Sequence, residues 1–180
     1  VAATRLDARP GEVETAMKVA LLAAATLIVQ RALGWPGMPS WAGLITLPMV
    51  LLVAAALLQH GSRWTQLAIP LGLGWDLLLE PVVGPGGIAW SAAALALSGL
   101  AGVVADRSPK AWFAFGAAGT AVLLLTRAAT LVPLGLGGPI RWSPLLVNLV
   151  TTAALCGLVG WLRMLDLPSR WRSHRARKLR

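Results

Sequence analysis

Long apolar segments separated by short polar connections run through most of the chain. The hydrocarbon core of a bilayer is crossed by about 20 mostly apolar helical residues, with a range of about 17 to 25, and six segments meet or approach this length. They cover residues 17–34, 41–58, 65–80, 88–105, 111–134 and 143–163. The connections are rich in glycine and proline, which favour turns. The pattern predicts an all-α integral membrane protein with a bundle of six transmembrane helices.

The segment 65–80 differs from the others because polar and helix-breaking residues interrupt it. Pro70, Gly72, Gly74 and Asp76 all lie within its length. Such residues are tolerated in a spanning helix when neighbouring helices satisfy the freed backbone groups. We therefore expect this helix to pack inside the bundle.

Polar ends flank the six apolar segments. Residues 1–16 are of mixed charge and contain a Pro-Gly pair, which predicts a flexible cytoplasmic N-terminal lead. Met17, directly before the first apolar segment, looks like a natural start, so whether the lead belongs to the native protein stays open. We expect the membrane domain to cover residues 17–165 and a basic cytoplasmic tail to cover residues 166–180.

The composition supports this interpretation. Hydrophobic residues make up 57% of the chain and charged residues only 13%, whereas soluble domains carry about 25% charged residues. The net charge of +9 would suggest nucleic acid in a soluble protein, but seven of the sixteen basic residues lie within 163–180, beside a predicted span. Such a flank determines topology and contacts lipid headgroups. We therefore expect membrane lipids as partners and no nucleic acid.

The distribution of Lys and Arg predicts the orientation. With six spans and both termini in the cytoplasm, thirteen of the sixteen basic residues lie on the cytoplasmic side. Because cytoplasmic loops carry an excess of Lys and Arg, we expect a multi-pass protein of a bacterial inner membrane with both termini cytoplasmic. Tryptophan favours the headgroup level, and seven of the nine fall at expected boundaries: Trp35, Trp41, Trp64, Trp90, Trp112, Trp142 and Trp161.

Four ionisable residues lie inside or at the edge of the predicted spans. They are Arg31, Asp76, Glu80 and Arg127. A charge inside the membrane costs about 2.5 to 3.5 kcal/mol on insertion scales, so each is a candidate functional residue. Asp76 and Glu80 are one helical turn apart and share the expected depth of the two arginines. This predicts an ion-pair cluster that links the first, third and fifth helices.

Two other interpretations of these charges stay open. The long side chains of Arg31 and Glu80 could reach the membrane interface, which would leave only Asp76 and Arg127 to pair. Asp76 could instead be a proton or substrate site, although a transporter usually has more polar residues lining its path.

Polar and small residues mark two further helices. Asn148, which two threonines follow, favours interhelical hydrogen bonding, and the alternative is an amide that faces a partner or a ligand. In the fourth segment Ala94, Ser98 and Gly102 recur every four residues, with Gly99 beside them. This spacing permits close approach of a second helix, so these residues are candidates for structural or partner contacts.

The sequence contains no catalytic constellation. It has no phosphate-binding GxxxxGK loop, and His60 and His174 have no acidic or cysteine partners at metal-binding spacing. The single cysteine, Cys156, excludes a disulfide within the chain. We therefore expect a protein that is not an enzyme and that has no cofactor or metal.

Residues 69–107 carry a resemblance to a known family. They read IPLGLGWDLLLEPVVGPGGIAWSAAALALSGLAGVVADR. The glycine-rich start, the aspartate followed by leucines, the short turn with glycine, the apolar span ending in SGLAG and the basic exit resemble the signature region of the bacterial rod shape-determining protein MreD family. Glu80-Pro81 and Gly99 depart from the family pattern. Fainter likenesses are Gln30, the Pro-Ser-Trp sequence at 39–41, and Asn148.

The resemblance implies a non-enzymatic membrane subunit of the bacterial cell-elongation machinery, which helps maintain rod shape by scaffolding lateral-wall peptidoglycan synthesis. It implies an MreC-like partner and, through it, MreB, a RodA-type glycosyltransferase and a class B penicillin-binding protein. It also implies a fold similar to the six-helix substrate-binding subunits of energy-coupling factor transporters. The alternative function is such a solute-binding subunit, which would need a polar pocket of several hundred Å3 near Asp76, Glu80 and Asn148.

Overall fold

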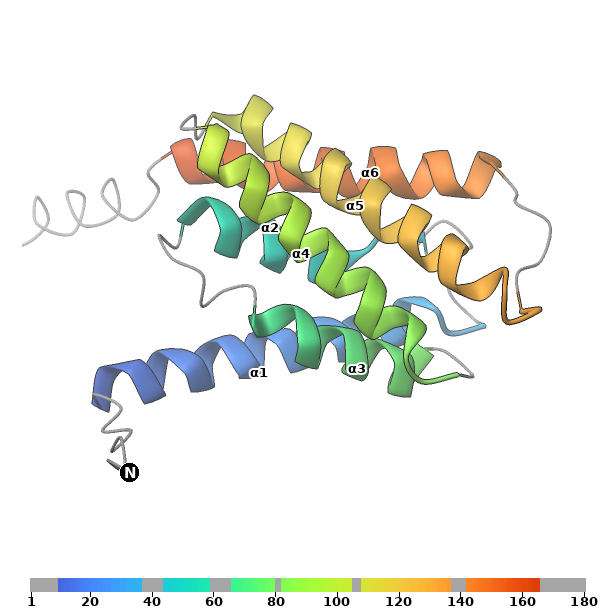
Figure 1. Cartoon of the computed structure of the whole chain (residues 1–180). Helices are drawn as coiled ribbons and strands as arrows, with labels where there is room; N and C mark the ends of the chain where they lie inside the picture. Colours follow the sequence, from blue (N-terminus) through green and yellow to red (C-terminus); the bar gives the residue numbers. More distant parts are fainter. Residues whose placement is uncertain are drawn as a thin grey trace, which may run out of the picture.

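The structure, a computed structural model, describes residues 10–36, 44–58, 66–79, 82–104, 108–136 and 142–165, and in this part of the chain it contains six helices and no strand. The helices are α1 Pro10–Leu33, α2 Leu47–Leu58, α3 Ala68–Leu79, α4 Pro85–Val103, α5 Pro109–Leu131 and α6 Trp142–Met164. Successive helices run in alternating directions along the bundle (Figure 1). The prediction of an all-α chain is confirmed.

Three of the helices are long and apolar enough to cross a membrane, namely α4, α5 and α6. They contain 19, 23 and 23 residues, which corresponds to about 28 to 35 Å of helix against about 30 Å of bilayer hydrocarbon. Large apolar side chains such as Leu95 and Leu125 are exposed on their outer faces. These helices indicate a membrane protein.

Helix α1 begins earlier than expected. It starts at Pro10, so residues 10–16, predicted as part of a flexible lead, are helical. Proline is favoured at the first helical position. This local signal agrees with a helix that begins before the apolar segment. The predicted remainder of the lead and the tail 166–180 lie outside the described residues.

Helices α2 and α3 are shorter than the predicted spans 41–58 and 65–80. Each has 12 residues, which corresponds to about 18 Å of helix. Pro48 has no N–H to donate, which is tolerated only in the first turn, and α2 begins one residue before it. Pro70 likewise lies in the first turn of α3. Neither described helix is long enough to cross a bilayer alone.

The central helix is α2, whereas α3, which we expected to pack inside the bundle, packs mainly against α4 and α1. Helix α2 packs against α1, α4, α5 and α6. Helix α3 buries one face against α4, while its leucines, among them Leu73 and Leu77, are exposed. The core has large buried side chains at its centre: Met49, Leu52, Val53, Leu71, Trp90, Leu97 and Phe115.

Helices α5 and α6 approach closely because glycine faces larger side chains at their contact. A Cβ atom added to Gly116 would lie 2.8 Å from the Cβ and Sγ atoms of Cys156. A Cβ atom on Gly160 would lie 2.5 Å from Cγ of Trp112. Trp112 is therefore buried inside the bundle, in the first turn of α5.

Candidate functional site

Polar side chains gather at one end of the bundle, which we call the polar end. The C-terminal ends of α1, α3 and α5 and the N-terminal ends of α2, α4 and α6 meet there (Figure 1). The polar end contains Gln30, Thr46, Asp76, Arg127, Asn148, Thr151 and Thr152, together with the glycine turn before α4. The predicted common depth of Asp76 and Arg127 agrees with this placement.

Asp76 is fully buried on the face of α3 that packs against α4. Its Oδ2 atom accepts hydrogen bonds from the backbone N–H of Gly84 at 2.7 Å and of Gly87 at 3.3 Å. Its Oδ1 atom accepts a third from the N–H of Gly86 at 2.9 Å. The first N–H groups of a helix have no partner within it and carry partial positive charge. The carboxylate thus caps α4 from the preceding helix.

The turn between α3 and α4 needs glycine at positions where the chain passes close to itself. Gly84 has φ of +128°, which side-chain-bearing residues rarely adopt. A Cβ on Gly86 would collide with the Asp76 carboxylate, and a Cβ on Gly72 would lie 2.6 Å from Cα of Gly87. These three glycines therefore allow the backbone to surround the Asp76 carboxylate.

The partners of Asp76 differ from the expected ion pair with Arg127. The Asp76 carboxylate is satisfied by backbone N–H donors, and among the described residues no ion pair joins it to Arg127. Side-chain types alone do not reveal these partners, because the backbone of a glycine turn supplies the donors. Arg31 is exposed on α1, so it does not join a buried cluster. Glu80 lies outside the described residues.

A second polar group holds the irregular backbone that precedes α2. The N–H of Leu47 donates to Oε1 of Gln30 at 2.9 Å, and Gln30 is only 4% exposed. The N–H of Thr46 donates to Oγ1 of Thr152 at 3.1 Å. Non-helical backbone at membrane depth is tolerated only where protein or water satisfies it. Side chains of α1 and α6 thus satisfy the backbone N–H groups at the point where α2 begins inside the bundle.

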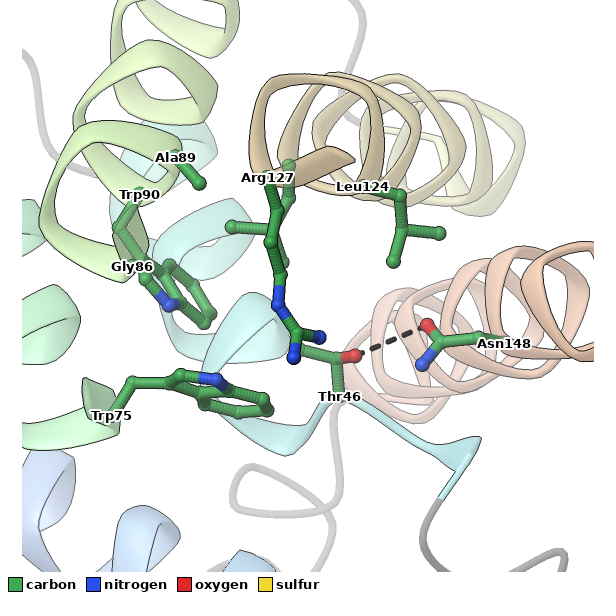
Figure 2. Close-up of a pocket in the computed structure, with 9 residues that line it drawn as sticks. Thr46, Trp75, Gly86, Ala89, Trp90, Leu124, Arg127 and Asn148 are labelled. Carbon is green, nitrogen blue, oxygen red and sulfur yellow. Dashed lines mark hydrogen bonds between the residues drawn. The ribbon is translucent and has the colours of Figure 1, made fainter. Parts of the chain in front are cut away.

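Asn148 takes part in this group through its side chain. Its Oδ1 atom accepts from Oγ1 of Thr46 at 3.1 Å (Figure 2) and from Oγ1 of Thr152 at 3.4 Å. Thr151 also contacts the α2 start, with its Oγ1 atom 3.4 Å from the carbonyl oxygen of Leu44. The geometry shows the interhelical hydrogen bonding that the sequence favoured for Asn148, within a larger network.

A small cavity lies between these two polar groups. It measures about 30 Å3 and is lined by Thr46, Trp75, Gly86, Ala89, Trp90, Leu123, Leu124, Arg127 and Asn148. The side chains of Arg127 from α5 and Asn148 from α6 point into it from neighbouring helices (Figure 2). A cavity needs about 10 to 15 Å3 to hold one water molecule, so this one has room for about two.

Two tryptophans form a wall of the cavity. The rings of Trp75 and Trp90 have centroids 5.7 Å apart and planes inclined by 54°, an arrangement typical of favourable aromatic pairs. Trp90 is only 1% exposed, so its ring packs against protein. Trp75 lies directly before Asp76 within the apolar segment 65–80, away from the boundaries where tryptophan is usual.

Two small residues of α4, Gly99 and Gly102, do not pack against other helices in the part of the chain that the structure describes. Gly99 and Gly102 are exposed, and a Cβ on either would have nothing within 4 Å. The Ser98 hydroxyl donates to the carbonyl oxygen of Leu95 on its own helix at 2.8 Å. Only Ala94 of this series is buried. None of the other described helices therefore approaches α4 closely at Gly99 and Gly102.

No group of three metal-binding side chains occurs among the described residues. Comparison with protein-family models, with characterised proteins and with solved structures gives no match to the chain.

Proposed function

We propose that the chain crosses the membrane six times, with both termini in the cytoplasm of a bacterium. The alternating directions of the six helices and the excess of Lys and Arg at one side support this arrangement. Helices α2 and α3 need not match the bilayer alone, because α2 is surrounded by protein and its irregular start is hydrogen-bonded by α1 and α6.

Within that membrane, the chain acts as a non-enzymatic scaffold of the cell-elongation machinery, as the resemblance of residues 69–107 to the MreD family implies. The observation that carries this proposal is the size of the polar cavity beside Asn148 and the Asp76 turn, about 30 Å3. Ligand pockets for small molecules measure about 300 to 1,000 Å3. The space at the expected substrate position therefore favours a scaffold over a solute-binding transporter subunit.

The direct partner in this proposal is an MreC-like protein, which would connect the chain to MreB, a RodA-type glycosyltransferase and a class B penicillin-binding protein. The exposed face formed by Ser98, Gly99 and Gly102 supports contact with a partner helix, because small residues allow close approach.

The test is co-purification of the affinity-tagged chain with an MreC-like protein from the same genome, after co-expression and detergent extraction. We expect a stable complex that Gly99→Leu weakens. A control is Ala154→Leu, which enlarges another small, exposed residue on α6, away from α4. Absence of any complex, with both proteins folded in the membrane, would contradict the scaffold proposal.

A further inference from the structure

We propose that a groove between α1, α2 and α3 binds one acyl chain of an anionic phospholipid. The groove lies away from the polar end, beside the second half of α2 and the start of α3. The inference rests on the membrane placement in the proposed function and goes beyond the scaffold role, because it assigns a lipid to a defined place on the chain.

The walls of the groove are entirely apolar. Its volume is about 160 Å3, and its nine lining residues are leucines and alanines, among them Leu22 of α1, Leu52 and Ala55 of α2 and Leu71 of α3. A water molecule in a cavity needs about two to four polar partners, whereas an apolar cavity of about 150 Å3 stays dry and binds an apolar molecule such as benzene. The chemistry of the groove therefore favours hydrocarbon.

The groove opens to the outside beside α1. Leu22 at its rim is 55% exposed, whereas Leu52 and Leu71 are 0% and 1% exposed. Leu22 belongs to the apolar segment 17–34, which the proposed topology places in the membrane, so the molecules that meet this opening there are lipids. Wall atoms that face an unfilled space lose their dispersion contacts, and an acyl chain that enters from the bilayer restores them.

The size of the groove selects a single chain as the occupant. Benzene has six carbon atoms, so a space of 160 Å3 takes about six carbon atoms of a hydrocarbon chain. An α-helix with its side chains is about 10 to 12 Å across, which is too wide for this space. The end of an unbranched acyl chain fits, while the rest of the lipid stays in the bilayer.

Basic residues next to the groove in the sequence favour an anionic headgroup. Leu58 and Leu67 both line the groove, and the connection between them carries Arg63. On α1, Lys18 precedes Leu22 by four residues, which is about one helical turn. Lys and Arg near the cytoplasmic surface of a membrane attract its anionic lipids. This charge therefore matches a lipid such as phosphatidylglycerol.

The experiment uses the full chain in phosphatidylcholine vesicles that contain a small fraction of phosphatidylglycerol with a diazirine at the end of one acyl chain. Mass spectrometry after illumination locates the labelled residues. We expect label at Leu52 or Ala55, which are almost fully buried and therefore out of reach of lipid around the bundle, and also at Leu125, which is 63% exposed on α5. Label at Leu125 without label on α2 would overturn the inference and leave the membrane placement standing.

Variants that fill the groove sharpen the test. Ala55→Leu should lower the labelling of α2 several-fold and keep the labelling of Leu125, because the larger side chain takes about half of the space for carbon atoms. Ala114→Leu, the same change at an exposed position of α5, should keep both. If Ala55→Leu does not fold, Ala54→Leu at another lining position replaces it. Unchanged labelling of α2 in the filled variants would overturn the proposal.

The headgroup is tested with photoreactive phosphatidylcholine that has the same acyl chains. We expect it to label α5 as strongly as phosphatidylglycerol does and α2 more weakly. Equal labelling of α2 by the two lipids would overturn the choice of an anionic lipid. Co-purification separates this inference from the scaffold role, because a chain that is labelled on α2 and forms no complex with an MreC-like protein would keep the lipid site and remove the scaffold proposal.

Discussion

Asp76 keeps a carboxylate inside an apolar bundle because three backbone N–H groups surround it. Hydrogen bonds to a charged acceptor contribute about 1.5 to 3 kcal/mol each, and an unmade bond at a buried donor costs about as much. The role of this residue in the fold therefore depends on both of its oxygens. The same reasoning applies to the glycines that bring the donors close.

We expect Asp76→Asn to destabilise the protein by about 1 to 3 kcal/mol, because an NH2 group cannot accept from the N–H groups it would face. Thermal unfolding in detergent measures the change. The matched control is Arg31→Gln, on the exposed face of α1, which should stay within about 0.5 kcal/mol of wild type. Equal stability of Asp76→Asn and wild type would contradict the capping role.

Two glycine-to-alanine changes should have opposite effects. Gly86→Ala places a methyl group against the Asp76 carboxylate and should lower the unfolding midpoint. Gly99→Ala, which meets open space inside α4, should stabilise the helix by about 0.5 to 1 kcal/mol, because alanine loses less backbone entropy. The midpoints of the two variants, compared in one detergent, check this. A neutral Gly86→Ala would speak against the close turn.

At the scale of helices, the sequence predicted the six apolar segments and their order, because hydrophobicity is a local property. It misjudged the ends. Helix α1 begins at Pro10, earlier than the predicted span. Helix α2 begins at Leu47, directly before Pro48 and later than the predicted span. The sequence also predicted that α3 packs inside the bundle, because glycines and an aspartate interrupt it, yet leucines of α3 such as Leu73 and Leu77 are exposed. Which face of a helix meets another helix depends on the whole packing, and one segment does not reveal it.

The candidate site was predictable in part for the same reason. Asp76, Arg127 and Asn148 stand out as polar residues in apolar segments, and the structure brings all three to the polar end. The partners of Asp76 could not be read from side-chain types, because they are backbone groups of the turn after α3. Gln30 and Thr46 act on the α2 start, and nothing in the local pattern shows that α2 begins inside the bundle.

The stability of the protein should depend on the Gln30 side chain, which accepts a hydrogen bond from the start of α2. Gln30→Leu leaves the buried N–H of Leu47 without its partner and should cost about 1 to 3 kcal/mol. Gln66→Leu makes the same chemical change at an exposed position before α3 and should have little effect. Thermal unfolding of both variants in the same detergent tests the difference, and equal midpoints would refute it.

For the whole molecule, the proposed topology predicts which positions a membrane-impermeant maleimide reaches in spheroplasts. Val83, which is exposed in the turn before α4, should be labelled as Val83→Cys before lysis. Lys110→Cys at the opposite end of the bundle should be labelled only after the membrane is permeabilised. The native Cys156 is fully buried and should not react with the maleimide. The reverse pattern would place both termini outside the cytoplasm.

The bonds from Thr46 to α6 join residues 106 and 102 positions apart. A ribosome releases α2 before Asn148 and Thr152 have been synthesised, so during translation the N–H and the hydroxyl of Thr46 lack these acceptors, whereas Leu47 can already donate to Gln30 on α1. In the proposed topology, a nascent chain that stops before residue 142 would leave the N–H of Thr46 without its acceptor inside the membrane, and a buried donor without a partner is costly. We therefore expect the start of α2 to be completed only when α6 has been made.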